Sequence, residues 1–519
     1  MTRARGRSGI MRSFGRTHLR LLDHDSLAAV DLGSNSFHLE IGRVVENQIY
    51  PLDDLREPVR LAAGLTRDKK LDRATQARAL ATLARFGERL RSLHPDAVRA
   101  VGTNALRIAK NSGEFLAEAE RVLGFPIEVI YGREEARLIY IGVSHALPPS
   151  SERRLVMDIG GGSTEFVIGT GYSPLLMESL PMGCVSYTLR FFGDGRIDRG
   201  AMKKAEVVAS SELERIVGEF RRAGWKHAVA SSGSARSIAA VLVANGWSEH
   251  GITAEGLDRL RSLLIKAGDV EKLDLPMLKP DRLAILPGGV AIMSAALSEL
   301  GMERLEISEG ALRQGVLYDL LGRVQHQDMR AATVAEFVRR YHVDTAQAQR
   351  VDKLALRLYH EIVVKPREAD ENVLRWSAAL HEIGLSIAQA AYHKHSAYIL
   401  SNADMPGFSQ MDQQRLARLV LGHRGKLTKL EGLALRSFDW DLILCLRIAA
   451  LVHRSRVDVS LPTLSCRETD SGFQLLLPRA WLEAHPLTAA ALEAEAEYWR
   501  AVGMRLDVKA VAPERLAAA

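Results

Sequence analysis

The sequence predicts an α/β protein with two related halves, followed by a helical region and a small C-terminal unit of mixed helix and strand. Three observations support this prediction. A glycine-rich turn between two apolar runs occurs twice, and helical and strand-like stretches alternate after each copy, as in a mixed sheet covered by helices. Long amphipathic stretches with helical spacing then follow from about residue 330.

The later of the two turns lies in the segment LVMDIGGGSTEFVI, residues 155–168. Asp158 ends an apolar run, and three glycines, two hydroxyl residues and Glu165 precede the next apolar run. Consecutive glycines let backbone N–H groups converge on an anion, and Asp158 at the strand end is placed to carry a hydrated cation against it. A glycine-rich hairpin without a ligand is the alternative for this segment alone.

The earlier turn lies in the segment AVDLGSNSFHLEIG, residues 29–42, which aligns with the later one without a gap. Asp31 matches Asp158 and Gly42 matches Gly169, so one constant offset relates the two segments. Repetition of a turn that suits phosphate predicts two related halves facing one another across a cleft.

Length and composition limit the possibilities further. A chain of 519 residues is too long for one hydrophobic core, so three or four domains are expected. A net charge of +6 and a pI near 9.1 favour an anionic partner. Three cysteines without paired spacing indicate neither a disulfide framework nor a zinc site, which predicts a cytosolic setting.

The N-terminal residues 1–24 carry six arginines and no apolar core of a secretory signal, which predicts a disordered basic tail. Contact of this tail with a polyanion, or with the inner face of the membrane, is the alternative. The longest uncharged stretch, residues 283–298, is too short for a membrane span and is interrupted by Pro287-Gly288-Gly289.

In the first half, the spacing of apolar residues predicts helices over residues 71–93 and 114–123 and strands over residues 98–102 and 127–131. Residues 132–137, GREEAR, then begin a helix whose acids suit the positive end of the helix dipole.

In the second half, a helix is expected over residues 201–222 and a strand over residues 227–231. A small-residue turn at residues 232–235 leads into another helix. A further helix is expected from Pro287, and a strand over residues 305–307.

Polar residues 322–330 resemble a linker. Amphipathic stretches at residues 334–341, 346–364 and 373–391 predict helices beyond it, and residues 472–477 predict a strand before a final helix through 497–499. The helical region also carries His381, His393, His395 and His423 beside several lysines and arginines. Metal ligation and a cationic, hydrogen-bonding wall are the two interpretations of these histidines.

Taken in order, these motifs resemble the Ppx/GppA phosphatases, a family of bacterial exopolyphosphatases and guanosine pentaphosphate phosphohydrolases. The resemblance rests on DLGSNS (31–36), GREEAR (132–137), DIGGGSTE (158–165), GCVS (183–186), SEGALRQGV (308–316) and HKHSAYIL (393–400). It implies duplicated ribonuclease H-like domains of the actin-like ATPase superfamily, an HD-like helical domain and a small α+β C-terminal domain. The expected ranges are a tail at 1–24, domains at 25–138 and 139–324, the HD-like domain at 325–461 and the last domain at 462–519.

The resemblance also implies roles for individual residues. Glu135 matches the general base that activates water, although its neighbour Glu134 is also acidic. Asp31, Asp158 and Glu165 match acids that bind Mg²⁺ or orient the nucleophile. The residues that match the phosphate-binding positions are Ser34, Asn35, Arg107, Gly160, Gly161, Gly162 and Ser163.

The helical region departs from the HD pattern, because His381-Glu382 stands where an HD metal site has His-Asp. We therefore expect it to guide substrate rather than to bind a second metal. The residues expected to form a polyphosphate channel are His393, Lys394, His395, Arg424 and Lys426.

The function expected from the resemblance is processive release of terminal orthophosphate from inorganic polyphosphate, with Mg²⁺ and as a homodimer. Guanosine pentaphosphate 5′-phosphohydrolysis is the nearest alternative, because the same turns serve both reactions. An actin-like ATPase or sugar kinase would use Gly288-Gly289 near adenosine, but the Glu134-Glu135 segment weighs against it. A non-catalytic sensor would not need all the acids that remain here. No nucleic-acid partner and no integral membrane segment are expected.

Overall fold

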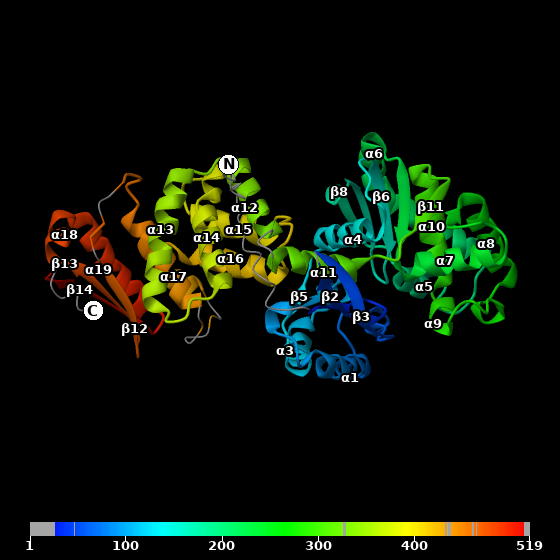
Figure 1. Ribbon diagram of the computed structural model, residues 1–519, viewed down its shortest axis with the longest axis horizontal. Coiled ribbons are helices and arrows are strands. Elements are labelled where there is room, and N and C mark those ends of the chain that lie inside the picture. Colours follow the sequence, from blue (N-terminus) through cyan, green and yellow to red (C-terminus); the bar gives the residue numbers. More distant parts are fainter. Residues whose placement is uncertain are drawn as a thin grey trace, which may run out of the picture.

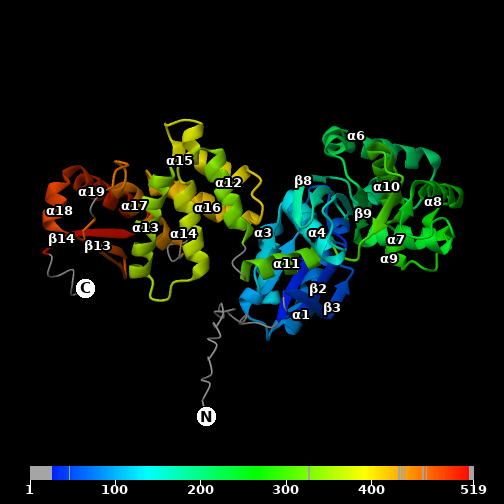
Figure 2. The same ribbon diagram turned by 45° about the horizontal axis from the view of Figure 1, so that its top comes forward.

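The computed structural model describes residues 26–512, except for 46, 325–327, 431–432, 434–436, 438, 459–460 and 463. The basic tail expected at residues 1–24 lies outside the described residues. Figure 1 shows an elongated molecule in which the first α/β half lies between the second half and the helical region, with the C-terminal sheet at the far end. Figure 2 shows the same order after a turn of 45°.

The first half is built on a five-stranded sheet with the order β3-β2-β1-β4-β5. β1, β2 and β3 are antiparallel neighbours, whereas β4 runs parallel to β1 and β5 parallel to β4. The strands are β1 (Ser26–Leu32), β2 (Phe37–Val45), β3 (Gln48–Glu57), β4 (Val98–Gly102) and β5 (Ile127–Val129). Three helices accompany them, α1 (Arg73–Leu90), α2 (Asn104–Ile108) and α3 (Ser112–Leu123).

The second half repeats this plan in a six-stranded sheet with the order β10-β11-β9-β6-β7-β8. Its strands are β6 (Arg153–Ile159), β7 (Thr164–Thr170), β8 (Ser173–Leu180), β9 (His227–Ser231), β10 (Ile252–Thr253) and β11 (Arg304–Ile307). Its helices are α5 (Cys184–Phe191), α6 (Arg199–Ala223), α7 (Ser232–Ala244), α8 (Ala254–Ala267), α9 (Pro280–Leu283) and α10 (Leu286–Leu300). Apart from the added edge strand β10, the order of strands and their directions match the first half.

The irregularities of the two sheets match as well. The pairing of β2 with β3 shifts register between Ile41 and Gly42, and the pairing of β7 with β8 shifts between Ile168 and Gly169. Gly42 and Gly169 are residues that the sequence repeat aligns with each other. Because bulges bend a strand at a defined point, their agreement confirms that the two turns belong to equivalent structural units.

Two helices, α4 (Gly132–Ala146) and α11 (Leu312–Val324), pack together between the sheets. Their apolar residues form one hydrophobic cluster with residues of both sheets, including Val101 of β4 and Val156 of β6. The boundary that we expected between residues 138 and 139 therefore falls inside α4. In addition, α11 packs against the sheet of the first half, although the whole second half separates α11 from that sheet in sequence.

The helical region contains α12 (Met329–Arg340), α13 (Thr345–Ile362), α14 (Glu368–Leu380), α15 (Tyr392–Asn402), α16 (Gln410–Gly422) and α17 (Asp439–Val452). The C-terminal unit contains β12 (Ser465–Thr469), β13 (Gly472–Pro478), α18 (Arg479–Ala484), α19 (Pro486–Arg500) and β14 (Arg505–Val511). Both parts contribute to a single hydrophobic cluster. A boundary between residues 461 and 462 thus does not separate two cores.

Two local predictions were wrong. The linker expected at residues 322–330 is shorter, since α11 continues to Val324 and α12 already begins at Met329. The helix expected at residues 373–391 ends at Leu380, and a short 3₁₀ turn, Ile383–Ser386, follows. Gly384 in this turn lets the start of α15 approach closely, because a Cβ there would lie 2.2 Å from the carbonyl oxygen of Tyr392. None of the described helices is long and apolar enough to cross a membrane.

Candidate active site

The two repeated turns lie directly against each other between the halves. A Cβ on Gly161 would lie 3.0 Å from the Cβ of Ser34, and a Cβ on Gly162 would lie 2.3 Å from Asn104 Oδ1. Such approaches are shorter than ordinary van der Waals contact. The glycines of the later turn thus leave the room that Ser34 and Asn104 occupy.

Hydrogen bonds connect each turn to the start of a helix in the same half. The hydroxyl of Ser34 accepts a hydrogen bond from the N–H of Ala105 at 3.2 Å, which connects the first turn to α2. The carbonyl of Gly161 accepts from the N–H groups of Val185 and Ser186 at 3.0 and 3.1 Å, which connects the second turn to α5. Each turn is therefore held by the first turn of a helix in its own half.

Three acids, which we call the site acids, lie at these turns: Asp31 at the end of β1, Asp158 near the end of β6, and Glu165 in β7. Asp158 and Glu165 are directly paired across the β6–β7 ladder. Asp158 accepts a hydrogen bond from the Ser231 hydroxyl, and Glu165 accepts one from the Ser179 hydroxyl at 2.8 Å. The exposed fractions of Asp158 and Glu165 are 7% and 1%, so both carboxyls are shielded from bulk water.

The site acids have raised pKa values. Burial and the charges of Glu135 and Asp158 raise the pKa of Asp31 to about 7. Burial and the charge of Glu135 raise the pKa of Asp158 to about 6, against the lowering effect of the Ser231 hydrogen bond. Burial, Glu135 and Asp158 also raise the pKa of Glu165 well above its ordinary value. Like charges in a shielded place favour protons or a bound cation.

The site acids suit a hard cation such as Mg²⁺ in their chemistry. Among the described residues, neither Asp31 Oδ1 nor Glu165 Oε2 has a hydrogen-bond partner, although both atoms are buried. No group of three or more His, Cys, Asp or Glu side chains in that part of the chain is placed so that its members could hold a metal ion together. Mg²⁺ does not require such a group, because it keeps several waters and binds one or two carboxylates together with phosphate oxygens.

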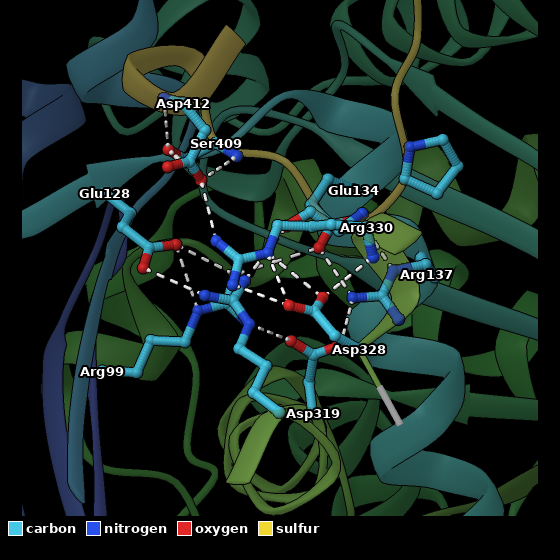
Figure 3. Close-up of polar contacts among 12 residues, drawn as sticks. Arg99, Glu128, Glu134, Arg137, Asp319, Asp328, Arg330, Ser409 and Asp412 are labelled. Atoms are coloured by element: carbon cyan, nitrogen blue, oxygen red, sulfur yellow. Dashed lines mark hydrogen bonds and ion pairs between the residues drawn. The ribbon is translucent and has the colours of Figure 1, made fainter. Parts of the chain in front are cut away.

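Glu134 and Glu135 are neighbours in the first turn of α4 and both are buried, but they have different partners. Glu135 Oε2 accepts a hydrogen bond from Arg107 Nη1 at 2.8 Å. Glu134 accepts from Arg137 at 2.7 and 2.8 Å in a separate ionic network (Figure 3). Since it is the charge of Glu135 that raises the pKa of every site acid, Glu135 and not Glu134 faces them.

A group of arginines, which the sequence analysis missed, surrounds His38, the residue paired with Asp31 across the β1–β2 ladder. Burial, followed by the positive charges of these arginines, lowers the pKa of His38 to about 2, so the imidazole is neutral. The arginines come from four different elements and are Arg313, Arg56, Arg282 and Arg236. No local pattern connects such residues, and only the fold brings them together.

A cavity of about 330 Å³ lies beside the acids and is lined by Asn104, Arg107, Ser163 and Ser179, among others. Asp404 of the helical region also lines it. The cavity thus combines a predicted phosphate-binding arginine and hydroxyl with a residue from the next structural region.

A larger cavity of about 660 Å³ lies in the helical region, at the start of α15. Four residues of the expected channel line it, together with Lys429: they are His393, Lys394, Arg424 and Lys426. His395 does not; its Cβ lies against Gly384 instead. Burial and the charges of Arg447 and Lys394 lower the pKa of Lys429 to about 7, which reflects the crowding of positive charge.

The other histidines of this region are held by backbone carbonyls. The ring nitrogens Nδ1 of His381 and His423 lie 2.8 and 2.6 Å from the carbonyl oxygens of Ala378 and Val420. Glu382 makes an ion pair with Arg456 at 2.6 Å. These contacts describe a packed interior rather than a set of ligands pointing at one ion.

Similarity to solved structures supports the fold. An exopolyphosphatase from Cytophaga hutchinsonii is 24% identical, with a TM-score of 0.52 over 58% of this chain and 98% of that one. An exopolyphosphatase-like protein is 23% identical, with a TM-score of 0.51 over 57% and 98%. The Ppx/GppA enzyme of Aquifex aeolicus is 25% identical, with a TM-score of 0.48 over 56% and 98%.

Family models match most of the chain. Residues 40–324 match the model of the Ppx/GppA phosphatase family, and residues 329–496 match that of Ppx/GppA phosphatase domain III. The first match covers the later turn, the GREEAR segment and α11, and the second covers the helical region. The chain is therefore a member of the Ppx/GppA phosphatase family.

Proposed function

We propose that this phosphatase is an exopolyphosphatase that releases terminal orthophosphate from inorganic polyphosphate, one residue after another. The observation that carries this proposal is a basic cavity in the helical region that one helix connects to the cavity beside the site acids. The 660 Å³ basic cavity lies at the start of α15, and Asp404, just beyond its end, lines the 330 Å³ cavity beside the acids. An 11-residue helix is roughly 16 Å long, a span that a polymer can bridge and a single phosphate cannot.

In the proposed reaction, the oxygen of a water molecule attacks the terminal phosphorus, and the bond from that phosphorus to the bridging oxygen breaks. Glu135 takes the proton of the water, and the shortened chain leaves as a phosphate oxyanion. Arg107 holds the Glu135 carboxylate at 2.8 Å. Phosphoryl transfer depends mainly on positioning and charge stabilisation, so a rigid carboxylate next to two facing turns suits it.

The facing turns would hold the terminal phosphate, through backbone N–H groups of residues 160–163 and through Ser34 and Asn35. The side-chain nitrogen Nδ2 of Asn35 is buried and has no hydrogen-bond partner among the described residues, which leaves it available as a donor. One or two of the carboxylates of Asp31, Asp158 and Glu165 would hold Mg²⁺ together with waters and phosphate oxygens. Bound there, Mg²⁺ would neutralise charge that develops on the phosphoryl oxygens.

Guanosine pentaphosphate is the alternative substrate, and the arginines around His38 suit the phosphates of either molecule. The cavity next to these arginines, lined by Ser234, Ser237, Arg282 and Gly289, holds only about 10 Å³. That is about the space of one water molecule, far less than a guanine base needs. This cavity therefore has no room for the base of the nucleotide.

Phosphate release from long polyphosphate and from guanosine pentaphosphate, each with its kcat/KM, tests the proposal. We expect kcat/KM for polyphosphate to be at least tenfold higher, and to fall steeply with salt, as binding of a polyanion by many cations does. A higher kcat/KM for the nucleotide would reject the assignment. The homodimer expected from the resemblance and the cytoplasmic location expected from the cysteine pattern stay predictions.

Glu135→Gln tests the role of the proposed base. Because a positioned general base contributes about 10²–10⁴ in rate, we expect a loss of that size in phosphate release, with retention on a polyphosphate resin unchanged. Glu114→Gln is the matched control, since Glu114 is an exposed acid in the first turn of another helix, α3. Near-normal turnover of Glu135→Gln would remove Glu135 from the mechanism.

A further inference from the structure

The first turn of α4, which carries Glu135, is in direct contact with the helical region. Arg133 Nη1 donates to Asp404 Oδ2 at 2.8 Å, and Arg133 also makes an ion pair with Glu178 of β8. Just before the helix, the hydroxyl of Tyr131 lies 3.4 Å from the carbonyl oxygen of Ser401. All of the partners in the helical region come from the end of α15 and the loop that follows it.

The most buried of these contacts is made by Gly407 in the loop between α15 and α16, residues 403–409. Its N–H donates to Glu134 Oε2 at 2.9 Å, and its carbonyl accepts from Arg323 Nη2 at 3.0 Å. Its φ is +86°, and a Cβ there would lie 3.0 Å from the backbone nitrogen of Arg330. The positive φ therefore favours glycine at this position, and a Cβ would also crowd the backbone of Arg330.

Glu134 belongs to a buried ionic network that connects the α/β halves with the helical region (Figure 3). Glu134 and Asp319 share Arg137, and Asp319 also accepts from Arg99 at 2.7 Å and from Arg323 at 3.1 Å. The exposed fractions of Arg99 and Arg137 are both 2%. Charges removed from water in this way keep their positions, because losing any partner leaves an unpaired buried charge.

The three consecutive residues 133–135 therefore have different contact partners. Arg133 contacts the helical region and β8, Glu134 contacts the helical region and the ionic network, and Glu135 faces the site acids. A shift of the 403–409 loop would rotate or translate the turn that carries Glu135. The loop lies at the active site in space, although it is distant from Glu135 in sequence.

We propose that the 403–409 loop of the helical region is a positioning element of the active site, which acts through Glu134 and Arg133 to hold Glu135 in place for water activation. This inference rests on the proposed role of Glu135. The helical region then controls the rate of the chemical step as well as the retention of polyphosphate.

The charge of Asp404 allows a role in substrate binding to be distinguished from a role in positioning Glu135. Asp404 lines the 330 Å³ cavity together with Arg107 and Ser163, so its negative charge opposes an anion bound there. If the residue acted only through substrate binding, loss of its charge would lower KM. If it positions Glu135 through Arg133, loss of the ion pair lowers kcat.

Tripolyphosphate is the probe for this test, because it is too short to reach from the acids to the basic cavity at the other end of α15. We expect Asp404→Asn to lower kcat on tripolyphosphate about tenfold, with KM unchanged or lower, and Asp404→Glu to recover most of the loss. Gly407→Ala should lower kcat by about 10²-fold, as expected for a displacement of roughly 1 Å. Asp458→Asn is the matched control, since the Asp458–Arg350 pair has the same 2.7–2.8 Å geometry within the helical region but does not contact α4.

The outcomes distinguish this inference from the proposed function. If the unaltered enzyme releases phosphate and Glu135→Gln does not, while Asp404→Asn and Gly407→Ala keep full kcat, the positioning role is wrong and the exopolyphosphatase assignment stands. If the unaltered enzyme hydrolyses neither tripolyphosphate nor longer chains, the proposed function itself fails. Should Gly407→Ala not fold, the kcat and KM of the half-exposed Asp404 variants decide the question.

Discussion

The two copies of the repeated turn are flanked by strands with the same order and the same bulge, but the residues at their tips differ. The earlier copy carries Ser34 and Asn35 where the later copy carries Gly161 and Gly162. Because the tips face each other, side chains on one are accommodated only by their absence on the other, as the 3.0 Å approach of a Gly161 Cβ to Ser34 shows. The two turns are similar in backbone, but their close packing allows side chains at the tip of only one of them.

The strands behind the tips differ in charge. Asp158 is paired with a second acid, Glu165, whereas Asp31 is paired with His38. In the later copy, burial and the charges of Glu135 and Asp158 raise the pKa of Glu165, whereas in the earlier copy burial, followed by the charges of the arginines, keeps His38 neutral. The later copy thus has two paired acids, and the earlier copy has one acid beside a neutral imidazole.

Substitution of the paired residues Glu165 and His38 should give the largest difference between the two copies. In Glu165→Gln, we expect the Mg²⁺ concentration for half-maximal activity to rise more than about 100-fold, because groups that only orient ligands already contribute about 10–100-fold. The equivalent change in the other copy, His38→Gln, should leave the Mg²⁺ requirement within about threefold, since a neutral ring is replaced by a neutral amide. A titration of phosphate release with Mg²⁺ checks both variants. Equal shifts would show that the copies are functionally alike.

A methyl group at the tip should have an intermediate effect. Gly162→Ala places a Cβ 2.3 Å from Asn104 Oδ1, so the Asn104 side chain must turn away from the site or the facing turns must separate, and we expect kcat/KM to fall by about 10–100-fold. Addition of Asn104→Gly should recover part of the loss by restoring space. Gly113→Ala is the control, because a Cβ there has no neighbour within 4 Å. Unchanged kcat/KM in Gly162→Ala would show that the fit between the turns is loose.

The smallest effect concerns pH and thermal stability without Mg²⁺. The folded protein keeps protons on Asp31 and Asp158 up to about pH 7 and 6, whereas the unfolded chain loses them near pH 4. These two acids should therefore lower the free energy of unfolding as the pH rises from about 4 to 7. Buried histidines such as His38, whose pKa is lowered to about 2, act in the opposite direction over part of this range, so the effect of the acids is measured as a difference between variants. In EDTA, we expect the Tm of Asp31→Asn to rise by a few °C relative to that of the unaltered protein between pH 5 and pH 8, and Mg²⁺ to reduce this change.

The two copies can be compared in the same measurement. Asp31→Asn should show a larger rise of Tm relative to the unaltered protein than Asp158→Asn does, because the pKa of Asp31 is the higher of the two. A Tm difference between variant and unaltered protein that stays constant from pH 5 to pH 8 in EDTA would contradict the raised pKa values of the acids.

The repeat could be predicted from sequence because its signal is local. Asp31, Gly33 and Gly42 keep their spacing in the second copy, and this spacing dictates the turn, the strand pair and the bulge together. The turns at Gly160–Ser163 and the helix start at Gly132 were predicted for the same reason. The roles of the acids in binding or chemistry stay predictions.

The remaining features depend on direction or on distant contacts. Glu134 and Glu135 stand one residue apart, a rotation of about 100° around the helix, so their separate partners follow only from packing. His395 turns away from the cavity that its neighbour Lys394 lines, for the same reason. The arginines around His38 lie in four elements, and the contact of Gly407 with Glu134 spans 273 residues. Sequence periodicity contains no information about such pairs.

The placement of α11 has a consequence for synthesis of the chain. Leu312, Val316 and Leu320 pack against Ala29 and Val101, so the first sheet lacks part of its cover until about residue 320 has left the ribosome. Contacts this distant in sequence close slowly. We therefore expect the N-terminal half to remain exposed to chaperones and proteases while the second half is being made, and the catalytic cleft to be the last part of the α/β region to form.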